Sequence, residues 1–412
     1  MRSGSEPRHA CRPVPSLLRG IYLPRSADAG AFAMTTYGIP LLVLATTNSA
    51  ALTGVAFALA WTPRLAAFAL AGGMVDRYGT TRVFRLASVA RAVVVLAAAL
   101  ILPGLDGRGG AVTVMLLAAT TGVLTEFSYI AAETAGGTAS RRAGDRAHRV
   151  QSVLLGIDQV ATLAGPALAG LMLQWIGAAG MLATIACFSL LGAILAPRQN
   201  PVRHAADPMP VIKGLRTGWA TLRSLPALAW LVTGLTLSNL ALGLLQAAAP
   251  VIVVKELGHS SVEVGLIWSA AAVASLLAVA VCRSAIDRYG LWPVGAVSAT
   301  IAASACLAVS SAHSYTTYLV LIAVLMAGEG GMTVVLRTLR SHLIPAAVFG
   351  STLSLTILLL QLPFPLAGVL VAVTPTDLLG HVIAPCAVLQ ALGLAIAFTR
   401  LRAHPVARAA TV

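Results

Sequence analysis

The sequence has little charge and even less negative charge. Only 10% of its 412 residues are charged, and 14 Asp and Glu accompany 28 Lys and Arg. An ordinary soluble domain has about 25% charged residues. Here 58% of the residues are hydrophobic, and the mean hydropathy is +0.87. These values exclude a water-soluble protein.

The signatures of several enzyme and metal-site classes are missing. The chain has no HExxH, GxSxG or GxxxxGK[ST] sequence, and its five cysteines include no CxxC pair. Those patterns are typical of zinc proteases, serine hydrolases, phosphate-binding loops and zinc sites. We therefore expect no enzymatic activity, no metal, no cofactor and no ATP hydrolysis on this chain. The first 20 residues also lack the apolar stretch and cleavage site of a signal peptide.

Long apolar runs are what the sequence has instead. Each of twelve runs is long enough to cross a hydrocarbon core of about 30 Å. Because backbone polar groups must be paired in lipid, each run is predicted to be an α-helix. The fold class is therefore an all-α polytopic membrane protein. Helices are expected over residues 20–46, 51–75, 83–103, 111–134, 150–174, 177–197, 225–254, 262–282, 291–311, 316–337, 349–373 and 378–399.

The basic residues lie almost entirely on one side of this predicted bundle. Two are lysines, Lys213 and Lys255, and the others are arginines. With the N-terminus inside, 24 of the 28 basic residues fall in inside segments. This positive-inside pattern predicts a multi-pass protein of the plasma (cytoplasmic) membrane with both termini in the cytoplasm. The net positive charge is therefore not evidence of nucleic-acid binding.

The chain divides near its middle and repeats itself. The tetrapeptide Asp-Arg-Tyr-Gly occurs at 76–79 and at 287–290, each time at the inner end of the second helix of a group of six. This coincidence predicts two pseudo-symmetric six-helix halves. The loop between them contains VIKGLRTGWATLRSL, an amphipathic segment suited to the membrane surface. The expected units are a cytoplasmic tail 1–19, a half 20–197, a cytoplasmic loop 198–224, a half 225–399 and a tail 400–412.

Two motifs carry a resemblance to a known family. Residues 72–82, GGMVDRYGTTR, resemble the signature G-x-L-x-D-R-x-G-R-R of the major facilitator superfamily, with Met74 for Leu and two threonines for the basic pair. Residues 165–170, GPALAG, resemble its antiporter motif G-P-x-x-G-G. The finer pattern is similar to the macrolide and siderophore exporters, which are drug:proton antiporters. It is carried by Pro40-Leu41-Leu42, Pro63-Arg64, Gly214-Leu215-Arg216, and Arg337-Thr338-Leu339-Arg340 with Pro345.

The resemblance assigns a conformational switch to the first motif. It implies that Asp76 caps the N-terminus of helix 11 and holds the outward-open state, while the glycines let a neighbouring helix approach. The alternative is that Asp76 is a solvated charge that only orients the chain. This alternative is stronger for Asp287 in the second copy of the motif, which lacks the glycines. The switch residues are Gly72, Gly73, Asp76, Arg77, Gly79 and Arg82, with Asp287 and Arg288 in the second copy.

The second motif comprises Gly165, Pro166 and Gly170 in the outer half of helix 5. The resemblance implies that it seals the outer end of the transporter against leak. Ordinary close packing of small residues between helices is an equal alternative.

Five ionisable residues lie within the apolar runs, namely Arg64, Arg91, Glu126, Asp158 and Glu329. Such residues cost about 2.5–3.5 kcal/mol at a helix centre and are functional candidates by default. The candidates for proton coupling are Glu126, then Glu329, then Asp158, together with Arg91. Helix 4 lacks the arginine of the larger drug-antiporter branches, so their proton relay does not transfer directly. In the alternative, Arg91 only neutralises Asp158 or Glu126.

Polar and aromatic residues on the predicted cavity helices are candidates for substrate contact. A few polar groups in an apolar wall suit an amphipathic organic molecule. Helix packing is the alternative role for such residues. The candidates are Thr36, Tyr37, Phe127, Tyr129, Asn239, Gln246 and Met332.

These features predict a secondary active transporter that works by alternating access. The expected function is proton-driven efflux of a small amphipathic molecule, either a drug or a secondary metabolite. An uptake symporter of the same superfamily and a non-transporting receptor are the alternatives. The expected partners are the small-molecule substrate, protons and the lipid bilayer, with no nucleic acid, and the chain is expected to be a monomer.

Overall fold

The computed structural model describes residues 17–105, 107–142, 147–197, 211–345 and 348–402. The described chain forms helices joined by short connections, and it contains 12 helical spans long and apolar enough to cross a membrane. The predicted fold class is therefore confirmed. Hydropathy identifies these spans well because each must satisfy its own backbone hydrogen bonds.

The first six spans form one half of the bundle. A short π-helical turn, η1 (Leu18–Tyr22), leads into the first helix. The helices are α1 (Leu23–Thr47), α2 (Ala50–Tyr78), α3 (Thr80–Ile101), α4 (Arg108–Arg142), α5 (Ala147–Trp175) and α6 (Gly177–Leu195).

The other six spans form the second half, and a separate amphipathic helix precedes them. The amphipathic helix is α7 (Val211–Ser224). The second half comprises α8 (Pro226–Val251) with the π-helical turn η4 (Ile252–Glu256), α9 (Ser261–Tyr289), α10 (Leu291–Val309), α11 (Tyr315–Leu343), α12 (Phe349–Gln361), α13 (Pro363–Val373) and α14 (Leu379–Arg402). Helices α12 and α13 together make one span.

Several helices extend beyond their predicted limits. Helix α4 continues to Arg142, although its apolar run ends near residue 134, and α9 continues to Tyr289 instead of residue 282. Polar residues can extend a helix past the hydrocarbon region, because there the backbone no longer depends on apolar side chains. Hydropathy therefore predicts the membrane segment and not the end of the helix.

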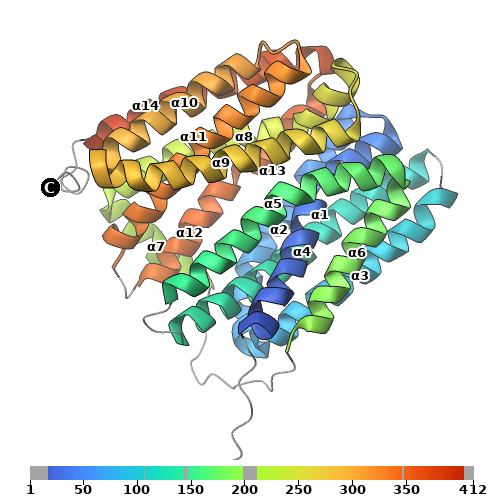
Figure 1. The fold of residues 1–412 in the computed structure, drawn as a ribbon, viewed down its shortest axis with the longest axis horizontal. Helices are drawn as coiled ribbons and strands as arrows, with labels where there is room; N and C mark the ends of the chain where they lie inside the picture. Colours follow the sequence, from blue (N-terminus) through green and yellow to red (C-terminus); the bar gives the residue numbers. More distant parts are fainter. Residues whose placement is uncertain (1–16, 106, 143–146, 198–210, 346–347, 403–412) are drawn as a thin grey trace, which may run out of the picture.

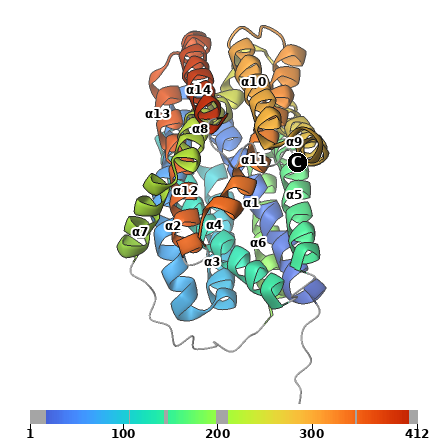
Figure 2. The same cartoon turned by 90° about the vertical axis from the view of Figure 1, so that its left-hand side faces the viewer.

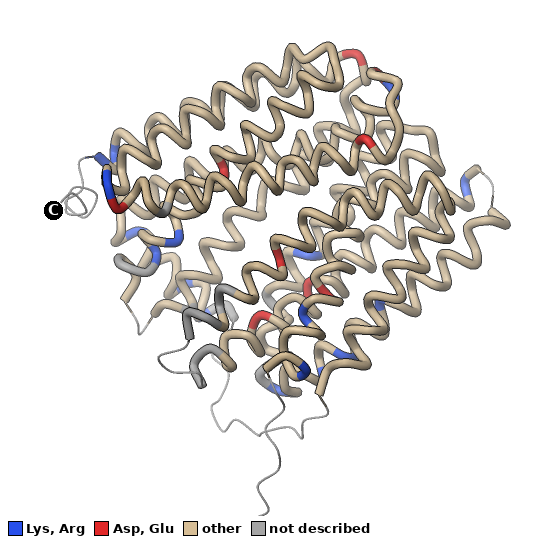
Figure 3. Tube along the Cα trace, in the orientation of Figure 1, with Lys and Arg blue, Asp and Glu red and all other residues tan. Residues whose placement is uncertain are grey.

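We call the end of the bundle at which η1 begins and α14 ends the terminal end, and the opposite end the far end. The two halves lie side by side and converge toward the far end (Figure 1). Figure 2 shows the same two groups of helices from another side, with α7 at the edge of the bundle. In Figure 3 the Lys and Arg positions gather toward the terminal end.

The repeated tetrapeptide has the same backbone geometry in both halves. Gly79 has φ +85° and Gly290 has φ +89°, and each ends one helix and begins the next. Each glycine N–H donates to the carbonyl four residues earlier, at 2.8 Å. Only glycine adopts this conformation cheaply. The repeat therefore marks a shared helix-to-helix corner, which explains its position.

Alanine at these two corners is expected to destabilise the protein equally. Gly79→Ala and Gly290→Ala should each lower the free energy of unfolding by about 1–3 kcal/mol, because a Cβ strains the positive-φ backbone. Gly72→Ala is the matched control in a helix interior. No heavy atom lies within 4 Å of its added Cβ, so it should raise stability slightly. Thermal melting in detergent measures all three, and equal melting of the three variants would contradict the strain argument.

The eleventh span is broken between α12 and α13. Pro363 begins α13 and has no N–H to donate to the helix. The side chain of Asn239 on α8 donates to the Leu360 carbonyl, at 2.8 Å. Asn239 thus binds backbone at the break, which is the packing role that the sequence left open for it.

Candidate transport site

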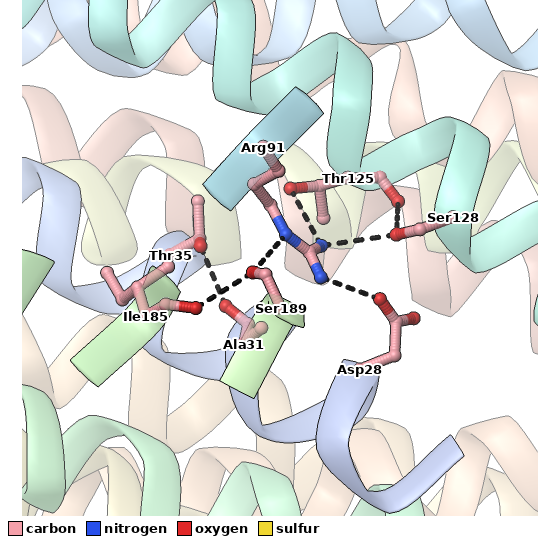
Figure 4. Close-up of polar contacts among 8 residues, drawn as sticks. All are labelled: Asp28, Ala31, Thr35, Arg91, Thr125, Ser128, Ile185 and Ser189. Atoms are coloured by element: carbon pink, nitrogen blue, oxygen red, sulfur yellow. Dashed lines mark hydrogen bonds and ion pairs between the residues drawn. The ribbon is translucent and has the colours of Figure 1, made fainter. Parts of the chain in front are cut away.

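Arg91 is the centre of a buried polar cluster in the first half. It lies on α3 and is 0% exposed. Its guanidinium donates to Asp28 Oδ1 at 2.8 Å, to Ser189 Oγ at 2.8 Å and to Ser128 Oγ at 3.1 Å. Figure 4 shows these side chains converging on Arg91 from α1, α4 and α6. The cluster therefore neutralises the arginine and fastens four helices together.

A second ion pair joins α2 to α4. Arg64 Nε lies 2.5 Å from Glu126 Oε2, and both side chains are buried. The guanidinium stacks between the rings of Phe32 and Trp61, with centroid distances of 4.7 and 4.4 Å. The other carboxylate oxygen of Glu126 is buried without a hydrogen-bond partner. Glu126 is thus held by a cation and is not a free acid.

A third cluster lies around Arg25 on α1. Arg25 donates to both carboxylate oxygens of Asp158, at 2.9 and 2.7 Å. Its Nη2 also lies 2.9 Å from Glu133 Oε2, and its guanidinium lies over the Tyr129 ring. The Asp158 and Glu133 side chains are 36% and 57% exposed, whereas that of Arg25 is 4% exposed. This cluster is the most open of the three.

These pairings differ from the expected ones. Arg91 binds Asp28, whereas Asp158 binds Arg25 and Glu126 binds Arg64, so the alternative in which Arg91 neutralises Asp158 or Glu126 is wrong. Equal depth along the helices suggested those pairs, but the rotation of each helix decides which side chains meet. The positive-inside pattern includes Arg25 among the cytoplasmic basic residues that orient the chain. Its position inside the first predicted helix, beside an apolar run, was the available signal.

The second half holds one buried acid of a different kind. Glu329 on α11 is 7% exposed and accepts a hydrogen bond from Ser238 on α8. Gln390 on α14 donates to Ser238 Oγ at 2.8 Å and approaches Glu329 Oε1 at 3.4 Å. Among the described residues, Glu329 has no ion pair. The carboxyl therefore lies in a site of neutral hydrogen-bond donors.

Sequence reasoning missed Ser238 and Gln390. Both are fully buried polar residues within apolar runs. Hydropathy and charge single out ionisable residues in a membrane helix, and neutral polar residues give a weaker signal. A buried glutamine in a membrane helix has no aqueous partner, so it must hydrogen-bond to another helix. That requirement was a usable signal for Gln390.

The two glycines that begin the switch motif lie in open space in this conformation, although Val75 of the same motif packs in an apolar cluster with Ala131 of α4. Within the described part of the chain, no heavy atom lies within 4 Å of a Cβ added at Gly72 or Gly73, so no described helix makes the expected close approach to these glycines. The Asp76 side chain is outside the described set. Arg77 lies over its neighbour Tyr78, and Arg288 over Tyr289, with centroid distances of 5.4 Å in each case. Arg77, Arg82, Asp287 and Arg288 are exposed at the terminal end.

The helix 5 motif lies where the halves meet at the far end. A Cβ at Gly170 on α5 would collide with the backbone of Ser261 on α9, and one at Gly265 on α9 would collide with Pro166. Ser269 on α9 also donates to the Leu163 carbonyl, at 2.5 Å. The missing side chains thus allow two helices from different halves to pack backbone to backbone.

A second contact between the halves joins α2 to α13. The Trp61 and Phe364 rings stack with centroids 4.2 Å apart. A Cβ at Gly54 would collide with Ala372 on α13, and one at Gly368 would collide with Ala58 on α2. These residues also lie toward the far end of their helices. The same end has a hydrogen bond from Lys255 Nζ to the Asn48 carbonyl, at 2.5 Å.

Filling the helix 5 contact is expected to separate the halves at the far end. Gly170→Leu would place its Cβ into the Ser261 backbone, whereas a Cβ added at Gly156 on the same helix meets no described atom within 4 Å, so Gly156→Leu is the control. A cysteine introduced at Ser269 reports the separation through its rate of labelling by a water-soluble maleimide. Gly170→Leu should raise that rate several-fold and Gly156→Leu should not. Equal rates would show that this contact does not close the far end.

The predicted substrate-contact residues do not form one surface. Tyr37 packs on Trp268 of the other half, and Tyr129 packs on Phe32, with ring centroids 5.4 Å apart in both pairs. Phe127 packs instead with an apolar cluster that includes Val75. Met332 is fully buried in the main core, Gln246 is half-buried on α8, and Thr36 lines a small cavity of about 30 Å³ beside Arg64.

Comparison with known proteins identifies the family. The model of the Major Facilitator Superfamily matches residues 26–368. No curated protein matches the chain significantly. Solved structures that share its fold include three with identities of 12–17%, which support the fold alone.

The first of these is a bacterial homologue of the iron transporter ferroportin in an inward-facing state, with TM-score 0.70, 17% identity, and coverage of 93% of this chain and 98% of that one. A mutant of the nucleoside transporter NupG has TM-score 0.70, 12% identity, and coverage of 91% and 100%. A bacterial metal transporter has TM-score 0.64, 16% identity, and coverage of 93% and 97%. This chain belongs to the Major Facilitator Superfamily and is a membrane transporter, not an enzyme.

Proposed function

We propose that the protein is a secondary active transporter that exports a small amphipathic organic molecule while protons run inward. The observation that carries this proposal is Glu329, which lies buried in the second half and whose hydrogen-bond partners among the described residues, Ser238 and Gln390, are neutral. A buried carboxyl without a counter-ion gains most from binding a proton. The family supplies the alternating-access framework within which such a group couples two fluxes.

The orientation follows from the distribution of charge. Basic residues gather at the terminal end, and the positive-inside rule places that end in the cytoplasm. The close contacts between α5 and α9 and between α2 and α13 lie toward the far end. We infer that this conformation is closed to the outside and open toward the cytoplasm of a plasma-membrane protein.

The charges of the buried polar residues favour a cation as the coupling ion. Three arginines, Arg25, Arg64 and Arg91, are buried in the first half and each is bound to at least one acid. Glu329 adds a negative charge in the other half that no described cation balances. An anion would therefore meet a net negative site, whereas a proton would neutralise it. Glu329, and not the ion-paired Glu126 or Asp158, is therefore the proposed proton carrier.

Export is supported by the position of the helix 5 motif. Gly165 and Gly170 belong to a sequence that resembles an antiporter motif, and Gly170 lies in the seal between the halves. The segments Pro40-Leu41-Leu42 and Pro63-Arg64, which resemble the exporter branch, agree with export. An uptake symporter and a non-transporting receptor would have no need of such an antiporter motif. The protein is proposed to act as a monomer.

A comparison of cell contents tests this function. Cells that express the protein and cells that express Glu329→Gln are loaded with a panel of amphipathic drugs and extracts, and the retained molecules are measured. Export predicts that one chemical class is depleted only in cells with the wild-type protein. Accumulation of that class instead would establish uptake, and equal retention of every compound in the two kinds of cell would overturn the proposed export.

A further inference from the structure

Helix α7 has two opposite faces. Lys213, Arg216 and Arg223 are exposed along one face, and Trp219 beside them is 48% exposed. The helix contains no acidic residue. At 100° per residue these three basic residues fall within one quadrant of the helix. The face is thus a cationic stripe with one aromatic ring at its border.

The other face of α7 is fixed to the second half. Leu222 is 4% exposed, and a Cβ at Gly218 would lie 2.6 Å from the Ser351 carbonyl oxygen of α12. Leu215 and Leu222 pack into the main hydrophobic core. The helix is therefore held against the first turns of α12, outside the bundle, as Figure 2 shows. Its cationic stripe is left on the side away from this packing.

We propose that the cationic stripe of α7 binds the headgroups of anionic phospholipids in the leaflet at the terminal end. Charge complementarity identifies the partner, because basic residues next to a membrane attract anionic lipid and a tryptophan favours the interface. The first turns of α12, against which α7 packs, are the point at which the eleventh span enters the membrane. Lipid binding would hold α7, and through Gly218 the α12 segment, at the membrane surface.

The test uses the full-length protein in nanodiscs. Ala220 is exposed on the same face, so Ala220→Cys in a background without other reactive cysteines reports whether that face is covered. A water-soluble maleimide should label it at least about tenfold more slowly in discs that contain phosphatidylglycerol than in discs of phosphatidylcholine, given three basic residues near the surface. High salt should remove the difference, because it screens the charges.

Two further variants separate lipid binding from other causes. Neutralising the stripe with Lys213→Gln, Arg216→Gln and Arg223→Gln should abolish the lipid dependence of labelling. Neutralising Arg337 and Arg400, which are exposed at the same end but outside α7, should leave it intact. Equal labelling in both lipids, or slowing that persists in the stripe variant, would overturn the proposal. None of these outcomes depends on transport, so the proposed function is tested separately.

Discussion

Glu329→Gln is expected to abolish concentrative transport while leaving the fold intact. The amide keeps the shape of the side chain and its neighbours Ser238 and Gln390, but it cannot gain or lose a proton. In proteoliposomes with an imposed proton gradient, uphill movement of the exported compound should fall to the level of vesicles without protein. Movement down the compound's own gradient should continue, because the halves can still rock.

Glu126→Gln is the matched control for this result. Glu126 is equally buried but ion-paired to Arg64, so its loss leaves a buried arginine without its anion. Breaking a buried pair in this way costs about 3–5 kcal/mol. We expect lower thermal stability with proton coupling retained in the folded fraction. Normal uphill transport by Glu329→Gln, together with uncoupled transport by Glu126→Gln, would reverse the assignment.

Arg91→Leu is expected to destabilise the first half strongly. It leaves the Asp28 carboxyl buried without its partner, since Asp28 is 1% exposed and is bound by Arg91. The expected loss is about 3–5 kcal/mol of the free energy of unfolding. Yield of folded protein after detergent extraction and thermal melting both measure it.

The double variant Arg91→Leu with Asp28→Leu tests the reason for that loss. It removes both charges, and Ser189 and Ser128 keep their own bonds to backbone carbonyls, at 2.8 and 3.0 Å. Replacing a buried ion pair by apolar residues is often close to neutral. The double variant should therefore melt near the wild type. If it is as unstable as Arg91→Leu alone, packing and not the unpaired charge sets the cost.

The fold could be predicted from the sequence because the bilayer imposes a strong and simple requirement. An apolar run must be long and helical to cross it, and the Asp-Arg-Tyr-Gly repeat marked the two halves independently. The helix ends were less predictable, since α4 extends to Arg142 on polar residues. Hydropathy does not register a helix that continues outside the membrane.

The candidate site was only partly predictable. The buried acids and Arg91 could be identified because ionisable residues are costly in lipid. Their partners could not, because Arg91 meets Asp28 and Arg25 meets Asp158 through helix rotation and tilt. The neutral surroundings of the buried Glu329 carboxyl are formed by Ser238 and Gln390 from two other helices. No local pattern in the sequence brings those three residues together.

Proton movement by the purified protein tests the central claim most directly. Proteoliposomes that hold a pH indicator inside, at equal pH on both sides, receive the exported compound in their lumen. The account predicts that wild-type protein couples the exit of the compound to proton entry and acidifies the lumen, and that Glu329→Gln releases the compound without acidification. Exit from wild-type vesicles without a pH change would contradict proton antiport, and acidification by Glu329→Gln would contradict the role given to Glu329.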